Sequence, residues 1–288
     1  MRNLAHMSFI CLLAAFQVTA QQDTIELHIR SGVTTLFDGT SVPAKAYTTS
    51  DNFVRNSDIL ALSEGQNVLF RVINDDVEEH GFTASGLITI ATIAPTDTVD
   101  QEITLNTSGI FRYFDPIDSF RNTYLGLSGI IHIKETGDPA SYFYWDLREI
   151  SPVWNDELII NNSVDPLTYS PEYFQINGNS SPYIDLDPLA KIIGSVGEEI
   201  RVVIMNNGQS IHSIHFHGYH AEILIHSSNP EQQGRSKDTF PIYPSAHLLL
   251  SFTPDKPGLY PVHDHNLVAV TGGGIYHAGM FTTLEIAP

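Results

Sequence analysis

The stretch GEEIRVVIMNNGQSIHSIHFHG, residues 197–218, is the part of the sequence that most clearly predicts the fold of this protein. Residues 200–205 form a run of strand-forming side chains, and the polar segment NNGQS at 206–210 supplies a turn. The residues after this turn alternate between apolar and polar, as in a strand with one buried face. Two strands joined by a turn are therefore expected here.

The rest of the chain shows the same pattern. TIELHIR (24–30), GIFRYFD (109–115), HLLLSFTP (247–254) and MFTTLEI (280–286) alternate or run apolar, and Gly, Pro, Asn and Asp separate them. No stretch has a sustained helical period. The sequence predicts an all-β protein built from β-sandwiches.

The two halves of the chain are predicted to be copies of one sandwich. When residues 65–82 are laid over the segment 197–216, Asn74 falls on Asn206 and His80 falls on His212. Further along, YFDP (113–116) falls on VHDH (262–265) in the same order. We therefore expect a first domain at 21–136 and a second at 183–288, with an ordered, aromatic-rich connector at 137–182.

The first twenty residues are predicted to be a secretory signal. Arg2 gives a basic start, FICLLAAF (9–16) is a short apolar stretch, and small residues precede Ala20. This apolar stretch is shorter than the ~20 residues that a spanning helix needs. We expect export to the periplasm or the medium and no membrane insertion. Cys11, the single cysteine, lies inside this segment, so the exported chain would have no thiolate ligand.

The charge of the chain argues against two classes of partner. Lys and Arg total 14 against 33 Asp and Glu, which gives a formal net charge of −19. Nucleic acids and anionic lipid surfaces bind through positive patches. Neither is expected as a partner.

Histidines carry the main chemical signal. Nine of the thirteen lie between His212 and His277. His215 and His217 are two residues apart, as are His263 and His265, so each pair points to one side of a strand, with about 7 Å between its two residues. If the two strands are neighbours, four imidazoles meet, and imidazole is a preferred ligand of copper and zinc. The alternative, that these are surface histidines without a ligand, explains a single pair more easily than two.

Three motifs carry a resemblance to a known family. SIHSIHFHG (210–218), GLYPVHDH (258–265) and HAGMFTTLEI (277–286) resemble the C-terminal domain of the multicopper oxidases, which include laccases and ceruloplasmin and are related to copper nitrite reductase. The resemblance implies two tandem cupredoxin-like, Greek-key β-sandwiches of the plastocyanin-like type. It also implies an assembly in which this face meets an adjacent subunit, as in a homotrimer.

The resemblance assigns roles to individual histidines. His215 and His217 match ligands of the type 2 and type 3 coppers, and His263 and His265 match ligands of the type 3 pair. His212 matches a ligand of the electron-transferring type 1 copper, for which Met280 matches the axial ligand.

The departures from the family pattern are informative. Asp264 stands where the family has the type 1 cysteine, and Ile275 stands where it has the second type 1 histidine. In the first domain, Thr83 and Ser85 occupy the positions of His215 and His217. A blue-copper centre needs a thiolate. We therefore expect no type 1 copper and, at most, a mononuclear or dinuclear copper site with His ligands, with zinc less well supported.

Asp264 is expected to point into the sandwich, away from the flanking histidines. A buried carboxylate needs a partner, and His212 is the candidate by position. The sequence predicts a hydrogen-bonded Asp264–His212 pair in the former type 1 region. It leaves open whether this pair is structural or forms a second metal site.

Two functions from different classes fit these residues. The first is an atypical copper oxidoreductase that takes electrons directly from a small-molecule or metal-ion donor. The second is a non-catalytic protein that sequesters or delivers copper on a degenerate oxidase scaffold. The exported chain keeps only Met205 and Met280, whereas Cu(I) carriers often use methionine-rich tracts.

Overall fold

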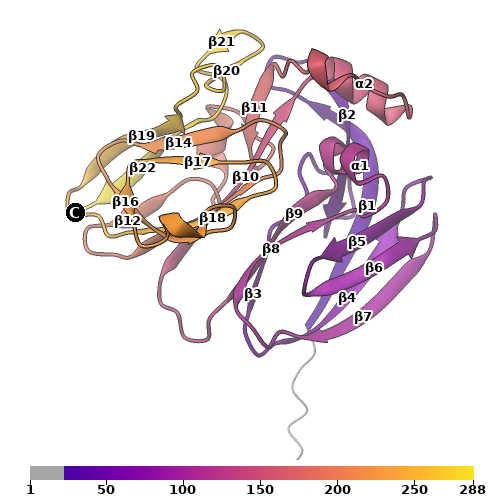
Figure 1. Cartoon of the computed structure of the whole chain (residues 1–288), viewed down its shortest axis with the longest axis horizontal. Coiled ribbons are helices and arrows are strands. Elements are labelled where there is room, and N and C mark those ends of the chain that lie inside the picture. Colours follow the sequence, from indigo (N-terminus) through magenta and orange to yellow (C-terminus); the bar gives the residue numbers. More distant parts are fainter. Residues whose placement is uncertain (1–22) are drawn as a thin grey trace, which may run out of the picture.

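The structure, a computed structural model, describes residues 23–288 and consists of two β-sandwiches (Figure 1). The predicted signal segment and Cys11 lie outside the described residues. Within 23–288 no helix is long and apolar enough to cross a membrane. The predicted all-β fold is confirmed.

The first sandwich has two sheets, of four and five strands. The four-stranded sheet has the order β2-β1-β4-β7, and the five-stranded sheet has the order β3-β9-β8-β5-β6. The strands are β1 (Asp23–Thr35), β2 (Ser41–Thr48), β3 (Leu60–Ser63), β4 (Asn67–Asn74), β5 (His80–Ala84), β6 (Ile88–Ile93), β7 (Thr98–Thr104), β8 (Gly109–Phe114) and β9 (Ser128–Lys134).

The second sandwich repeats this order with one extension. Its sheets have the orders β11-β10-β13-β18-β15-β16 and β12-β22-β19-β14-β17, and a two-stranded sheet, β20-β21, stands apart. The strands are β10 (Ser141–Ile150), β11 (Tyr173–Ile176), β12 (Ile193–Ser195), β13 (Ile200–Asn206), β14 (His212–Phe216), β15 (Ala221–His226), β16 (Ser236–Lys237), β17 (Thr239–Ile242), β18 (His247–Phe252), β19 (Gly258–Asp264), β20 (Thr271–Gly272), β21 (Ile275–Tyr276) and β22 (Phe281–Ala287).

The predicted internal repeat is visible in the strand pairing. β1 pairs in parallel with β4, and β10 pairs in parallel with β13 at the same place in the second sandwich. The parallel pairs β3–β9 and β12–β22 correspond in the same way. By this pairing, the segment 137–182 supplies β10 and β11 to a sheet of the second sandwich.

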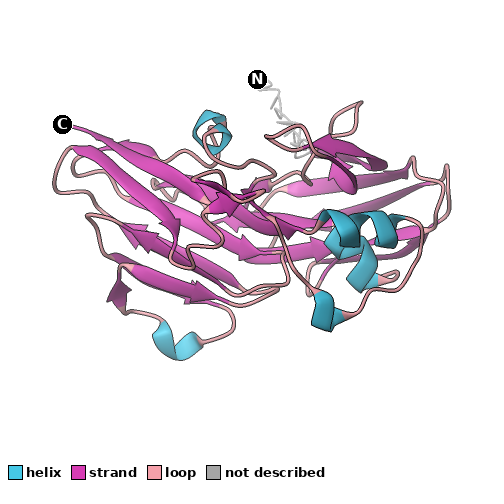
Figure 2. Cartoon of the chain, turned by 90° about the horizontal axis from the view of Figure 1, so that it is seen from above, coloured by secondary structure: helices cyan, strands magenta, loops and turns pink. Residues whose placement is uncertain are grey.

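Short helices lie at the edges of the sheets (Figure 2). Two of them, α1 (Ser119–Leu125) and α2 (Pro152–Ile159), pack beside β2. Proline at the first position of α2 suits its start, because that N–H has no intrahelical partner. The 3₁₀ turns are η1 (Pro166–Thr168), η2 (Tyr183–Leu186) and η3 (Pro230–Gln232).

Each sandwich has its own apolar core, and a third cluster joins them. β4 alternates between buried and half-buried residues, as a strand with one inward face should. β13 is buried on both faces, because Val203 and Met205 pack against Ile110 and Ile130 of the first sandwich. The continuous apolar run of β13 thus reflects the contact between the domains.

Candidate metal centre

The two predicted histidine pairs lie on adjacent strands. β14 pairs antiparallel with β19, and in this register His215 lies opposite His263. Ile214, Phe216 and Val262 on the same strands are buried in the core. Because side chains alternate along a strand, this burial directs the histidines to the outer face of the sheet.

Four imidazole rings gather on this outer face, with His215 in the middle. The centroid of the His215 ring lies 4.6 Å from that of His217, 5.7 Å from that of His263 and 5.6 Å from that of His265. His217 and His265 are exposed, and His215 and His263 are half-buried. We call this set, His215, His217, His263 and His265, the histidine face.

Two ring nitrogens in the histidine face already converge. Nε2 of His217 lies 3.0 Å from Nε2 of His263. Two nitrogens bound to one metal ion at ~2.0–2.1 Å would lie roughly 2.8–3.4 Å apart for ligand angles of about 90–110°. Burial and the neighbouring His215 and His263 lower the pKa of His217, which favours the neutral ring that a metal requires.

Hydrogen bonds fix the tautomers of two rings. Nδ1 of His263 donates to the carbonyl of Asp264 at 2.8 Å. Nδ1 of His215 faces the carbonyl of Asp238 at 3.1 Å and the hydroxyl of Thr239 at 3.0 Å. A carbonyl can only accept, so both Nδ1 atoms carry hydrogen and both Nε2 atoms carry a lone pair. In His263 this lone pair accepts from Nε2 of His217. Residues that do not bind the metal themselves commonly orient metal-binding histidines by hydrogen bonds of the kind formed by these Nδ1 atoms.

Asp264 points to the opposite side of the sheet, as predicted, and the expected hydrogen bond to His212 is present. Oδ2 of Asp264 lies 2.6 Å from Nδ1 of His212, and both side chains are buried. Oδ1 accepts from the backbone N–H groups of Ser213 and Asn266 at 3.2 and 2.8 Å. The other nitrogen of His212, Nε2, lies 3.2 Å from Oε2 of Glu149 on β10. We call Glu149, His212 and Asp264 the buried triad.

The buried triad has the geometry of a charged structural network. A carboxylate faces each ring nitrogen of His212, so the ring is best accommodated as a protonated imidazolium that donates twice. Burial alone would lower the pKa of His212, but hydrogen bonds to Asp264 and Glu149 raise it to about 9. The two carboxylates lie on opposite edges of the ring and leave it no free nitrogen.

The positions that the resemblance assigns to a type 1 copper include Asp264, Ile275 and Met280. Met280 is buried close to Asp264, whose N–H donates to the Met280 carbonyl at 3.1 Å. Ile275 is 52% exposed on β21 and offers no ligand atom. In the structure, both nitrogens of His212 face carboxylates of the buried triad.

The first sandwich contains an equivalent triad. Nδ1 of His80 lies 2.7 Å from Oδ2 of Asp115, and its Nε2 lies 2.9 Å from Oδ2 of Asp76. Asp76, Glu78 and His80 are the only cluster of three potential ligands with converging atoms within 23–288. The ammonium of Lys45 lies 2.9 Å from Asp76, 3.4 Å from His80 and donates to Glu78. A cationic side chain therefore already lies among these three residues.

The positions of the first sandwich that match the histidine face hold no imidazoles, as the internal repeat predicts. Thr83 lies opposite Phe114 in the β5–β8 pair, at the place where His215 lies opposite His263. Within residues 23–288, two histidine pairs with this i, i+2 spacing on adjacent strands are found in the second sandwich alone.

Sequence reasoning missed three contributors. Glu149 lies 63 residues before His212 in the chain, inside the segment expected as a connector. Asp238 and Thr239 contact His215, but their position at the start of the short strand β17 did not predict this contact. No spacing rule could have found Glu149, because its place depends on the parallel pairing of β10 with β13.

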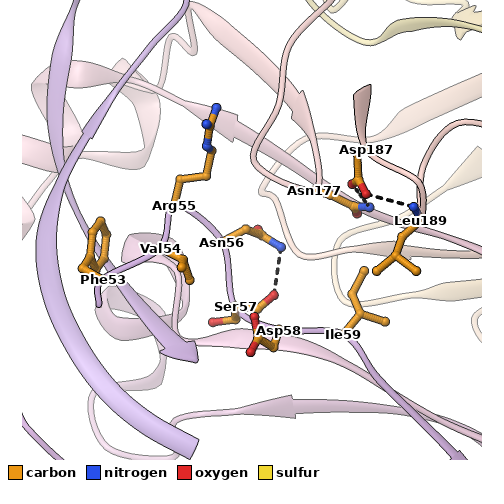
Figure 3. Close-up of a pocket in the computed structure, with 10 residues that line it drawn as sticks. All are labelled: Phe53, Val54, Arg55, Asn56, Ser57, Asp58, Ile59, Asn177, Asp187 and Leu189. Carbon is orange, nitrogen blue, oxygen red and sulfur yellow. Dashed lines mark hydrogen bonds between the residues drawn. The ribbon is translucent and has the colours of Figure 1, made fainter. Parts of the chain in front are cut away.

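An open cleft of about 440 Å³ lies between the sandwiches (Figure 3). It is lined by residues 53–59 and by Asn177, Asp187 and Leu189. Asp187 accepts hydrogen bonds from Asn177 at 2.8 Å and from the N–H of Leu189 at 2.9 Å (Figure 3). It contains no histidine, so it adds nothing to the metal centre.

Comparisons with known proteins agree with the two-sandwich fold and with the family resemblance of the second sandwich. Residues 165–282 match the family model for multicopper oxidases. The chain is 23% identical over 184 residues to ceruloplasmin of Ovis aries, a match that covers 61% of this chain and 16% of ceruloplasmin. The chain thus spans about a sixth of the length of the curated relatives it matches.

Solved structures share the arrangement of both sandwiches. A blue copper oxidase from Nitrosomonas europaea superposes with a TM-score of 0.78 at 20% identity, covering 92% of this chain and 86% of that one. A copper nitrite reductase from the same organism gives 0.71 at 17% identity, covering 93% and 94%. The predicted cupredoxin fold is confirmed.

Proposed function

Because residues 165–282 are a multicopper oxidase domain within a two-domain cupredoxin fold, we propose that the chain is an exported copper protein whose copper is bound by histidines alone. The observation that carries the proposal is the convergence of His217 and His263, whose Nε2 atoms lie 3.0 Å apart beside His215. We assign copper rather than zinc because the domain belongs to a copper family, although imidazole suits both metals.

The proposed site has no type 1 copper beside it. Both nitrogens of His212 face carboxylates, and Asp264 replaces the thiolate that such a centre needs. Electrons therefore cannot reach the histidine face through the relay that the family resemblance implies. They would come directly from a small-molecule or metal-ion donor at the exposed side, where His217 and His265 face solvent.

As an oxidoreductase, the protein would use its histidines to hold and orient the metal. Copper would supply one-electron chemistry and Lewis acidity toward a small oxidant such as oxygen, peroxide or nitrite. Thr239 and the Asp238 carbonyl keep the Nε2 atom of His215 unprotonated and fix the plane of its ring. On the opposite face of β14 from the histidines, Ile214 and Phe216 pack in the apolar core of the second sandwich.

One observation favours the second candidate, a copper-sequestering or copper-delivering protein. The buried triad removes the electron relay, and a binder does not need one. The two candidates differ in turnover, since only the oxidoreductase consumes oxygen in the presence of a phenolic or metal-ion donor.

The test uses the chain without its first twenty residues, loaded with Cu(II). We expect a type 2 signal in electron paramagnetic resonance and no blue thiolate-to-copper absorption. The signal should be lost in a variant that combines His215→Ala and His263→Ala. A blue band, or an unchanged signal in this double variant, would refute the proposed site. Oxygen uptake then distinguishes enzyme from binder, and a flat trace across donors selects the binder.

Export and assembly are further parts of the proposal. The basic and apolar start of the sequence supports export, and amino-terminal sequencing of the exported protein tests it. Leu267 and Val268, directly after His265, are 63% and 60% exposed, which supports burial of this edge against another subunit. Light scattering should give the mass of a trimer, and a monomer would contradict this part.

A further inference from the structure

A second cleft between the sandwiches has on its wall an arginine, Arg112, that no carboxylate contacts directly. β8 lies on the side of the first sandwich that faces the second (Figure 1). Ile110, Arg112 and Phe114 alternate along this strand, and Ile110 packs in the cluster that joins the sandwiches. With the segments 227–228 and 244–247, they line a space of about 460 Å³. This volume is within the range of about 300–1,000 Å³ that is usual for sites that bind small molecules.

Arg112 is held in a fixed position on the wall of this cleft. Its Nε donates to Oδ1 of Asn207 in the second sandwich at 2.6 Å. Its guanidinium carbon lies 5.2 Å from the centre of the Phe114 ring. Among the described residues no carboxylate pairs with Arg112, and its terminal nitrogens Nη1 and Nη2 have no hydrogen-bond partner. The free edge of the guanidinium is therefore the edge that binds planar oxyanions with two parallel hydrogen bonds.

The surroundings of Arg112 favour the binding of an anion. Burial and the nearby Arg148 lower the pKa of Arg112 to about 10, although Asp146, which accepts from the Asn207 amide at 2.7 Å, acts in the opposite direction. The guanidinium therefore stays protonated near neutral pH, but its burial is unfavourable. The charge of Arg148 is already matched by Asp146 at 3.0 Å. Burial and His226 lower the pKa of His247 to about 4, so this ring lines the cleft as a neutral group.

The remaining lining groups indicate the kind of anion. Ser85, Ser227, Ser228 and Ser245 bring hydroxyls to the cleft. Ile110, Phe114 and Pro244 provide apolar surface beside the guanidinium. We infer that this cleft binds a small organic carboxylate, with the carboxylate on Arg112 and the hydrocarbon part against Phe114 and its apolar neighbours.

The test measures binding to the metal-free chain without its first twenty residues, so its result is independent of the copper proposal. Isothermal titration calorimetry with benzoate should show binding at one site. Benzamide has the same shape without the charge, and we expect it to bind roughly 10-fold more weakly or worse. Inorganic phosphate should bind more weakly than benzoate, because it lacks the apolar part.

Variants identify the group responsible. Arg112→Gln should weaken benzoate binding by roughly 10-fold or more, whereas Arg235→Gln, which removes an exposed arginine elsewhere, should not change it. Equal binding of benzoate and benzamide, no binding of benzoate, or unchanged binding in Arg112→Gln would overturn the inference. Stronger binding of phosphate would overturn the assignment to an organic anion. If Arg112→Gln does not fold, the comparison of benzoate with benzamide on the unaltered chain still decides.

Discussion

Replacement of Asp264 by asparagine removes one charge from the interior of the second sandwich and keeps the side-chain volume. The amide oxygen of asparagine can still accept from the N–H groups of Ser213 and Asn266. What is lost is the carboxylate oxygen 2.6 Å from Nδ1 of His212. The variant therefore isolates the ionic part of the buried triad.

The size of the effect follows from the protonation of His212. The rise of its pKa from 6.5 to about 9 corresponds to about 3 kcal/mol in favour of the charged, folded form. Removal of one partner from a buried pair costs roughly 3–5 kcal/mol, because the other charge is left without compensation. We expect Asp264→Asn to lower the free energy of unfolding by about 3 kcal/mol at pH 7.

The stabilisation of the folded state by the buried triad should depend on pH. The folded-state pKa of His212 is raised, so its stabilisation is complete below its ordinary pKa of 6.5 and is lost as pH rises through about 9. The pKa of Glu149 is lowered despite burial, by its hydrogen bond to His212, so its contribution is present above 4.5 and is lost in acid. The difference between the original chain and Asp264→Asn should therefore be large at pH 7 and much smaller at pH 10.

Urea unfolding followed by tryptophan fluorescence measures this difference, because Trp145 lies in the core of the second sandwich. Asp255→Asn, at an exposed position, is the control and should change the free energy of unfolding by less than ~0.5 kcal/mol. An equal loss for Asp264→Asn at both pH values, or a loss below about 1 kcal/mol at pH 7, would refute a charged buried triad.

Three further predictions concern the other clusters. His217→Ala should weaken Cu(II) binding by roughly 100-fold or more. His265→Ala should weaken it by less, because the ring of His265 approaches only that of His215. Calorimetry measures both affinities, and equal losses would contradict this geometry. Thr239→Val should weaken Cu(II) binding by roughly 10-fold by freeing His215, and Thr239→Ser should restore it; unchanged affinity in the valine variant would exclude this role. Lys45→Met should lower the free energy of unfolding by roughly 3–5 kcal/mol, because it leaves Asp76 without its buried cation. Zn²⁺ should restore part of this stability in the variant alone, by binding to Asp76, Glu78 and His80. A melting temperature of the variant that does not respond to Zn²⁺ would show that a metal cannot replace the ammonium.

Local patterns in the sequence account for the fold and for the histidine face. Alternation along β4 and β14 reflects burial of one face, which is a property of neighbouring residues and needs no distant contact. The repeat placed His80 over His212 and Thr83 over His215, and the paired strands have this register. Spacing by two residues was enough to predict that the imidazoles share a face.

Contacts that join distant segments were decided only by the tertiary structure. Glu149 reaches His212 across 63 residues, and Lys45 reaches His80 across 35, because parallel pairing and sandwich closure bring their strands together. The sequence by itself determined two sandwiches, four outward imidazoles and an inward Asp264. Only the folded chain decided that His212 lies between two carboxylates and that no carboxylate contacts Arg112 directly. The physical reason is that the protonation and pairing of a group depend on the charges and water around it, and these come from segments that no local pattern connects.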